Sequence, residues 1–262
     1  MQMLSPAIPC HYHDTDIKMR DMLVRHLGAL RRATHSLESY YHDLSGNLVS
    51  PSRNSFHPYP TSFTTRDGLV KRFKYLSSMK GRSLFFGNID DDYGAAICVK
   101  FVTRYCEQAH RFLAERELAP RLHAVERLPG GQRMVVMDDV SNDYISLFNF
   151  IQDNPDLLSK DNEGTRNLFL QTVRDCLIQL HQAGFVLRDV RNTNITVKTI
   201  GLDDLSFLLV DYDSGGKIRQ VRYPLDLNTS TVKRPEGATG GAIVEVEHDL
   251  EMLNYVWDNC FL

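Results

Sequence analysis

Three polar residues of this sequence have the types and spacing that phosphoryl transfer requires. Asp189 and Asn194 lie five residues apart in the segment Leu187–Asn194, and Asp211 ends the apolar run Leu208–Val210. A carboxylate such as Asp189 can orient or deprotonate an attacking hydroxyl, whereas an amide oxygen and a second carboxylate can hold Mg²⁺. Asn194 and Asp211 are therefore the predicted metal ligands, and Asp189 is the predicted catalytic carboxylate.

A lysine ends another apolar run. The residues Ile97–Val99 precede Lys100, and a buried strand rarely carries an ammonium group without an anionic partner, because burying an unpaired charge is costly. Such a lysine can bind the α- and β-phosphates of a nucleotide. Lys100 is therefore predicted to meet Asp211 at a nucleotide-phosphate site. Asp213, two residues further on, either adds charge at the metal or caps a turn.

The periodicity of the surrounding segments predicts the elements that position these residues. Strands are predicted at Arg82–Phe86, Ala95–Val102 and Met134–Met137, helices at Cys106–Glu117 and Thr165–Gln182, and a final pair of short strands at Asn194–Val197 and Phe207–Val210. In the longer helix, the apolar face includes Leu168, Phe169 and Leu177. The predicted order is a group of small strands with a helix, then a long helix, then a strand pair with polar ends. This is the order of elements in a kinase-like fold.

The N-terminal part predicts a separate element. Apolar residues recur every three or four positions from Asp14 to Leu44, which indicates one long amphipathic helix capped by a residue of 14–16. We expect its apolar face to pack on its own domain. Because the pattern lasts about four heptads, a homodimer formed through residues 16–44 is the alternative. The Ser-, Pro- and Asn-rich segment Gly46–Ser62 predicts a linker.

Composition restricts the class of protein. The chain has 262 residues, 42% of them hydrophobic and 24% charged, which is enough for one two-lobed domain. No run approaches the roughly 18 apolar residues of a membrane span, and the first residues lack a signal peptide's basic start, so we expect a cytoplasmic or nuclear protein without membrane contact. A net charge of −3 without clustered Lys and Arg argues against a nucleic-acid surface. Five scattered cysteines without a C-x-x-C pair argue against disulfides and structural zinc.

Many segments along the chain also carry a likeness to a known family. They are Val99–Val102, Arg104–Tyr105, Ala109–Ala114, Leu118–Leu122, Glu126–Gly131, Val135–Met137, Gly184–Val186, Asp189–Asn194, Leu209–Asp213, Val221–Pro224, Arg234–Gly237 and Glu247–Leu253. Through them the chain resembles the small fungal protein-kinase-like proteins, distant relatives of aminoglycoside and choline kinases, from about Leu23 to Met252.

The resemblance implies an α+β, two-lobed protein-kinase-like fold in residues 63–262, preceded by the N-terminal helix and linker in residues 1–62. An antiparallel-sheet N-lobe would cover about 63–137, a hinge 137–140, and a short, mostly helical C-lobe 141–262. ATP and Mg²⁺ are the implied ligands, with Lys100 on the phosphates. Met137, Asp138, Asp139 and Val140 would lie under the adenine. The implied activity is transfer of the γ-phosphoryl group to a hydroxyl of a protein or a small molecule.

Departures from the family pattern leave a second interpretation open. No G-x-G-x-x-G precedes Lys100, since Gly87 and Gly94 alone cannot form a phosphate-covering loop. Gln108 stands where a helix Glu would pair with Lys100, so we expect Lys100 to pair with Asp211 or Glu107 instead. Leu187 stands where a His braces the catalytic loop, and Asp213 stands where many kinases have Gly. A pseudokinase that acts as a binding or scaffold module is therefore the alternative, and a helical dimer with an inert pocket is the third.

Overall fold

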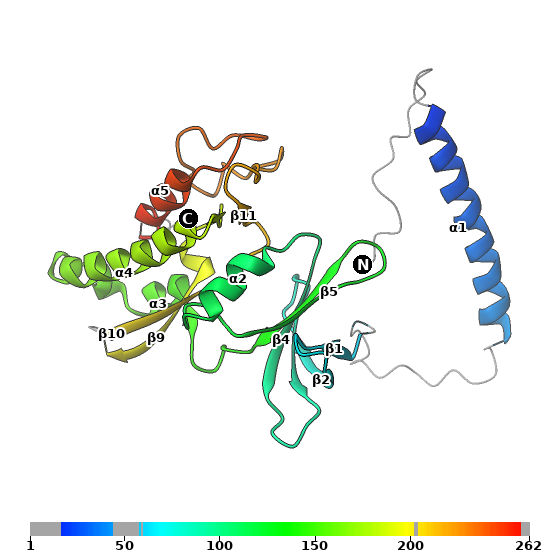
Figure 1. Ribbon diagram of the computed structural model, residues 1–262, viewed down its shortest axis with the longest axis horizontal. Coiled ribbons are helices and arrows are strands. Elements are labelled where there is room, and N and C mark those ends of the chain that lie inside the picture. The colour runs from blue at the N-terminus through cyan, green and yellow to red at the C-terminus, as the bar shows by residue number, and fades with distance from the viewer. Residues whose placement is uncertain (1–16, 44–57, 59, 202–203, 258–262) are drawn as a thin grey trace. The chain divides into compact units, whose positions relative to one another are not determined.

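The computed structural model describes residues 17–43, 58, 60–201 and 204–257 (Figure 1). The chain divides into two units, and the second, Thr61–Arg127 with Arg133–Leu262, contains the catalytic, phosphate and metal residues predicted above. The first unit contains the helix α1 (Ile17–Asp43), which confirms the predicted long helix. The predicted capping residues 14–16 and most of the predicted linker Gly46–Ser62 lie outside the described residues.

Helix α1 carries large apolar side chains that are exposed to solvent. Leu27, Leu30 and Leu37 are 56%, 58% and 50% exposed. The burial of this face, on its own domain or in a homodimer, stays a prediction. Within the ranges that the structure describes, no helix is both long enough and apolar enough to span a membrane.

A six-stranded antiparallel sheet forms the N-lobe. Its strands, in spatial order, are β1 (Ser62–Thr64), β2 (Val70–Ser78), β3 (Leu84–Ile89), β4 (Ala96–Val102), β6 (Arg133–Asp138) and β5 (Leu122–Arg127). The predicted strands correspond to β3, β4 and β6. The central pair β4 and β6 carries the apolar runs, and Ile97, Val99 and Val136 are fully buried. Burial of this pair holds Lys100 in a defined position near the end of β4.

The C-lobe is built mainly from helices (Figure 1). Its elements are β7 (Ile145–Ser146), α3 (Leu147–Asp153), η1 (Pro155–Leu158), η2 (Lys160–Asn162), α4 (Glu163–Gln182), β8 (Phe185–Val186), η3 (Asn192–Asn194), β9 (Ile195–Gly201), β10 (Asp204–Leu209), β11 (Gly216–Lys217) and α5 (Val246–Asn254). Helix α4 buries Phe169, Val173 and Leu177, which follow helical spacing, and α5 packs along it. The prediction that Leu168 shares this face was wrong: Leu168 is 65% exposed, because neighbouring helical residues point about 100° apart.

One apolar core joins the two lobes. Helix α2 (Glu107–Ala114) of the N-lobe buries Ala109 and Leu113 in the same cluster as Leu177 of α4 and Ile195 of β9. Since burying a large apolar side chain contributes about 1.5–3 kcal/mol, this shared core holds the sheet that carries Lys100 against the part of the chain that contains Asp189 and Asn194.

The hairpin of β9 and β10 brings the two polar loops together. In its antiparallel register Ile195 lies opposite Leu209, so Asn194 and Val210 leave the hairpin at the same end. The Val210 N–H donates to the Asn194 carbonyl at 3.0 Å. Asp211, which follows Val210, is thereby held next to the loop that contains Asp189 and Asn194.

Candidate active site

Lys100 lies between two carboxylates. Its Nζ atom is 2.9 Å from Asp211 Oδ1 and 2.6 Å from Asp213 Oδ2. The predicted pairing of Lys100 with Asp211 is therefore confirmed, although the two residues are 111 positions apart in the chain. Asp213 does not merely cap a turn, because its carboxylate also reaches the lysine.

Burial and charge shift the pKa values of all three groups. Burial opposes the charge of Lys100, but Asp211 and Asp213 raise its pKa above the ordinary value. Burial likewise opposes ionisation of Asp211, but Lys100 lowers its pKa. Burial, followed by the charge of Asp211, raises the pKa of Asp213 to about 6. With both acids ionised the cluster has one more negative than positive charge, a balance that a bound cation would relieve.

The donor atoms present fit a magnesium ion. Asp213 Oδ1 is buried and has no hydrogen-bond partner. The Asn194 amide nitrogen donates to the carbonyl and to Oδ2 of Asp189, at 2.9 and 3.1 Å, which leaves the amide oxygen as its acceptor atom. Within the described ranges no group of three His, Cys, Asp or Glu side chains could hold a metal. The carboxylate of Asp211 and the amide oxygen of Asn194 are hard ligands of the kind that Mg²⁺ prefers.

Asp189 is held by cationic side chains on both of its oxygens. Arg234 Nη1 lies 3.0 Å from Asp189 Oδ1, and Arg191 Nε lies 3.2 Å from Oδ2. Hydrogen bonds from Arg234 and from the amide of Asn194 fix the orientation of the carboxylate, whereas Arg191 Nε lies close enough for an ion pair but makes no hydrogen bond. An acceptor hydroxyl would approach Asp189 beside two guanidinium groups.

The loop that contains Asp189 and Asn194 is braced by Asp249 of α5, a residue that the sequence analysis did not assign to the site. Its fully buried carboxylate accepts hydrogen bonds from the backbone N–H groups of Leu187 (2.8 Å) and Arg188 (2.7 Å). Arg188 has φ 72°, a left-handed conformation that is unfavourable for a long side chain. His181 Nε2 also lies 3.1 Å from Asp249 Oδ2. The loop is thus held without a histidine at position 187.

The four predicted hinge residues divide between two faces of the sheet. Met137 lies opposite Cys98 in the register of β4 and β6, so its side chain shares the face of Cys98 and Lys100. Alternation places Asp139 on that face as well. Consistent with this, burial and then the charge of Asp139 raise the pKa of Cys98 to about 12, against the effect of Lys100. Cys98 therefore lines the Lys100 face, which the sequence analysis did not foresee.

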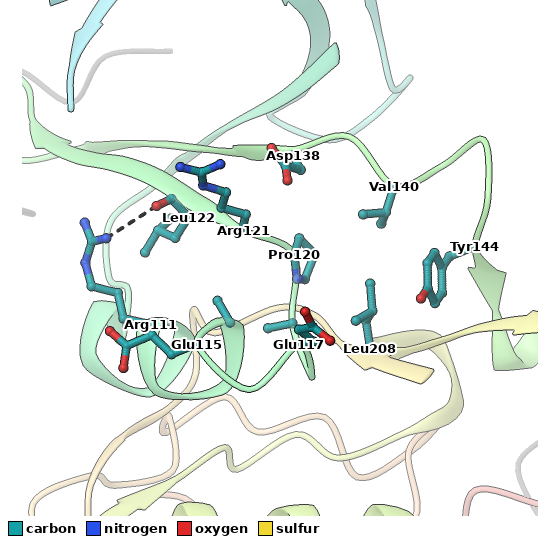
Figure 2. A pocket seen from close by; sticks show the side chains of 12 residues that line it. Arg111, Glu115, Glu117, Pro120, Arg121, Leu122, Asp138, Val140, Tyr144 and Leu208 are labelled. Carbon is teal, nitrogen blue, oxygen red and sulfur yellow. Dashed lines mark hydrogen bonds between the residues drawn. The ribbon is translucent and has the colours of Figure 1, made fainter. Parts of the chain in front are cut away.

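The other two hinge side chains, Asp138 and Val140, line a different cavity of about 640 Å³. Figure 2 shows them with Tyr144 and Leu208, and Asp138 also contacts His123 at 2.6 Å. Lys100, Asn194 and Asp211 do not belong to its lining. An adenine on the Lys100 face could meet the backbone of Asp138 and Val140, but their side chains are directed elsewhere.

Helix α2 contacts the site without supplying a carboxylate to Lys100. Glu107 pairs with Arg111 one turn along the helix at 2.8 Å, and Gln108 is exposed. The helix contacts Tyr212 instead. The Tyr212 carbonyl accepts a hydrogen bond at 2.9 Å from the N–H of Cys106, the residue that precedes α2. The ring of His110 stacks on Tyr212 with centroids 4.4 Å apart and planes within 5°. The Asp211–Asp213 turn is therefore attached to α2 through its middle residue.

His110 is buried as a neutral imidazole. Its Nε2 lies 2.7 Å from the Pro120 carbonyl, which can only accept, so Nε2 carries the proton and Nδ1 accepts from the Tyr105 hydroxyl at 2.5 Å. Burial lowers the pKa of His110 to about 4, and Arg111 adds to this effect.

This burial predicts a pH dependence of stability. Between pH 6.5 and pH 4 the unfolded chain binds a proton at His110, whereas the folded chain keeps this histidine neutral. The free energy of unfolding therefore decreases as the pH falls through this range. The full loss is about 3 kcal/mol. We expect His110→Gln to flatten the profile measured by denaturant unfolding over this range, whereas His35→Gln, which changes an exposed side chain, leaves it unchanged. Equal slopes for wild type and His110→Gln would contradict the prediction.

The turn between β2 and β3 precedes Lys100 in the chain, where the sequence analysis found no glycine-rich phosphate-covering loop. Leu84 pairs with Lys100, so residues 79–83 lie at the lysine's end of the sheet. The turn contains one glycine, Gly81 with φ 79°, next to the exposed cations Lys80 and Arg82. Gly87 instead lies within β3, where a Cβ atom would be 2.2 Å from the Lys74 carbonyl oxygen. Gly87 thus permits close strand packing.

Comparisons with known proteins agree with this architecture. No protein-family model and no curated protein sequence matches the chain. Among solved structures, the kinase PK-1 of Cydia pomonella granulovirus matches with a TM-score of 0.56 and 17% identity, over 72% of this chain and 67% of that one. Vaccinia related kinase 3 matches with a TM-score of 0.52 and 15% identity, over 79% of this chain and 73% of that one. The chain therefore has the α+β fold of the protein kinases.

Proposed function

We propose that this protein binds ATP with Mg²⁺ and transfers the γ-phosphoryl group to a hydroxyl acceptor. The observation that carries the proposal is the convergence of Lys100 and Asp211, with Asn194 and Asp189 on the adjoining loop. Neighbouring buried carboxylates repel each other unless a cation lies between them. Here Lys100 balances only one of the two acids it touches.

Each residue has a distinct role in this proposal. Lys100 binds the α- and β-phosphates, and Asn194 and Asp211 hold the metal through their side-chain oxygens. Bound Mg²⁺ would supply positive charge that offsets the charge of the phosphates. Asp189 orients the acceptor hydroxyl and accepts its proton. The amide of Asn194 holds the Asp189 carboxylate in a fixed orientation for this role. The backbone of residues 137–140 lies under the adenine.

A nucleotide-binding pseudokinase is the second candidate. The β2–β3 turn has only one glycine, and Arg234 and Arg191 occupy both oxygens of Asp189. In a pseudokinase these arginines would remain in place, and the acceptor hydroxyl would have no access to the carboxylate. Turnover distinguishes the two candidates, because both bind nucleotide.

The likeness to the small fungal protein-kinase-like proteins, distant relatives of aminoglycoside and choline kinases, supports an acceptor hydroxyl on a protein or a small molecule.

Self-association through residues 16–44 is a further part of the proposal. It is supported by the exposed leucines of α1, since an apolar helix face is typical of a surface that packs against another. Light scattering on wild type and Leu30→Lys tests it.

Calorimetry and thermal unfolding of the full chain with ATP test the proposed function. With millimolar Mg²⁺ we expect ATP to bind and to raise the free energy of unfolding, by about 2.7 kcal/mol at about 100 times its Kd. With EDTA in place of Mg²⁺ the effect should shrink strongly. Absence of both heat and thermal stabilisation at millimolar Mg²⁺ would exclude both candidates. Binding without phosphate release or transfer would favour the pseudokinase.

A further inference from the structure

Lys100 obtains its anionic partners from one three-residue turn. Asp211 and Asp213 both contact its ammonium group, and the Asp213 contact is the shorter of the two, at 2.6 Å. The acidic residue of α2, Glu107, is engaged by Arg111. Helix α2 therefore contributes no carboxylate to the lysine in this structure.

Metal binding creates competition for one of these partners. A carboxylate of Asp211 that coordinates Mg²⁺ has less negative charge to offer Lys100, since the metal is the stronger local charge. A lysine with a four-carbon stem and no second anion would lose its defined position, because its rotamers are numerous. Asp213 is the group that could retain the lysine in that state.

The backbone of the turn fixes where the Asp213 side chain can reach. Asp211 has φ 70°, and Tyr212 is 1% exposed. The Tyr212 carbonyl is hydrogen-bonded to Cys106 N–H, and its ring is stacked on His110. Asp213 therefore follows a residue whose position is fixed. Its carboxylate contacts Lys100 with little further loss of conformational entropy.

We propose that Asp213 is the positioning residue of Lys100, and that it performs within the turn the task that a carboxylate on α2 would otherwise perform. The proposal rests on the proposed function, because the lysine is positioned for nucleotide phosphates. Asp213 Oδ2 keeps the ammonium group in place while Asp211 serves the metal. Because Tyr212 packs against His110 of α2, the position of that helix determines where the turn places the Asp213 carboxylate.

The sign of one measurement separates this role from simple charge repulsion. Removing a carboxylate beside a phosphate site should strengthen the binding of an anionic nucleotide if repulsion alone mattered. If Asp213 positions Lys100, Asp213→Ala should instead weaken Mg²⁺–ATP binding, by about tenfold in Kd. Asp213→Glu, which keeps the charge, should recover part of the affinity. The matched control is Glu107→Gln, which removes the carboxylate of α2 and should leave Kd unchanged.

A double-mutant cycle then shows whether Asp213 acts through the lysine or through the metal. In a Lys100→Ala background, Asp213→Ala should cost no further affinity, because there is no ammonium left to position. An effect of Asp213 that persists undiminished in that background, together with a higher Mg²⁺ requirement, would overturn the proposal and make Asp213 a metal ligand. Unchanged or tighter binding by Asp213→Ala would overturn it as well.

Failure of this inference is distinct from failure of the proposed function. If wild type does not bind Mg²⁺–ATP, the proposed function fails and the positioning role fails with it. If wild type binds, and Asp211→Ala removes binding while Asp213→Ala does not weaken it, the proposed function stands and only the positioning role is rejected. Thermal unfolding of each variant without nucleotide verifies that the protein is folded.

Discussion

Asp211→Ala is expected to abolish Mg²⁺-dependent ATP binding. The carboxylate of Asp211 is a proposed metal ligand and lies 2.9 Å from the ammonium group of Lys100, the proposed phosphate ligand. Changing residues that merely support a metal ligand costs 10–100-fold in affinity, so removing the ligand itself should weaken binding by about 100-fold or more. Calorimetry at millimolar Mg²⁺ measures the loss, and binding with EDTA should change much less.

The fold should survive this substitution, which makes the loss interpretable. Asp211 and Asp213 repel each other, so removing one of them relieves a like-charge contact, although Lys100 loses a partner. Asp143→Ala is a suitable control, because it also removes one negative charge but from an exposed carboxylate that pairs with Lys198. If Asp211→Ala retains wild-type affinity, Asp211 is not the metal ligand and the proposed site is wrong.

Asp189→Ala should have the second large effect, on turnover and not on binding. Its carboxylate contacts Arg191, Asn194 and Arg234, and not Lys100, the proposed phosphate ligand. Loss of a positioned general base usually lowers turnover by about 10²–10⁴-fold. We expect the Kd of Mg²⁺–ATP to stay close to that of the wild type while phosphoryl transfer to acceptor or water is lost.

A second variant separates charge from geometry at this position. Asp189→Asn keeps an oxygen for Arg234 and the shape of the side chain, but it cannot accept a proton. If Asp189 acts as a base, both variants should be inactive. If Asp189→Asn keeps wild-type turnover, the residue only holds Arg234 and the loop in place. Thermal unfolding is needed beside both assays, because Asp189→Ala leaves two guanidinium groups without their counter-ion.

Local patterns in the sequence were sufficient to predict the contact between Lys100 and Asp211. Apolar runs that end in Lys100 and Asp211 indicate buried strands with charged ends, and the short strand pair around Asn194 predicts that its two loops meet. The long helices were likewise predicted, because helical spacing is visible over many turns. In contrast, β2 and β5 were missed: Lys71 and Lys74 in β2 and Glu126 in β5 interrupt the apolar pattern that marks a strand.

The partners of these residues were decided by tertiary structure. Asp249 lies 62 positions from Leu187, and nothing in the pattern of a short amphipathic helix indicates that its acid is buried under a distant loop. Glu107 lies one residue from the position expected to supply a carboxylate to Lys100. It forms an ion pair with Arg111, one turn along the same helix, instead. Whether Asp138 or Met137 faces the lysine depended on the register of β4 and β6.

The same distinction holds for Asp213. Its position after Asp211 is plain in the sequence, where it replaces the glycine of many kinases, but two readings remained open, added charge at a metal or a turn cap. Packing of Tyr212 against His110 fixes the turn so that the Asp213 carboxylate reaches Lys100, a contact that neither interpretation included. The sequence by itself determined which charged groups enter the buried region, because spacing and apolar runs are local properties. Only the tertiary structure decided which charges touch, because that depends on how distant segments pack.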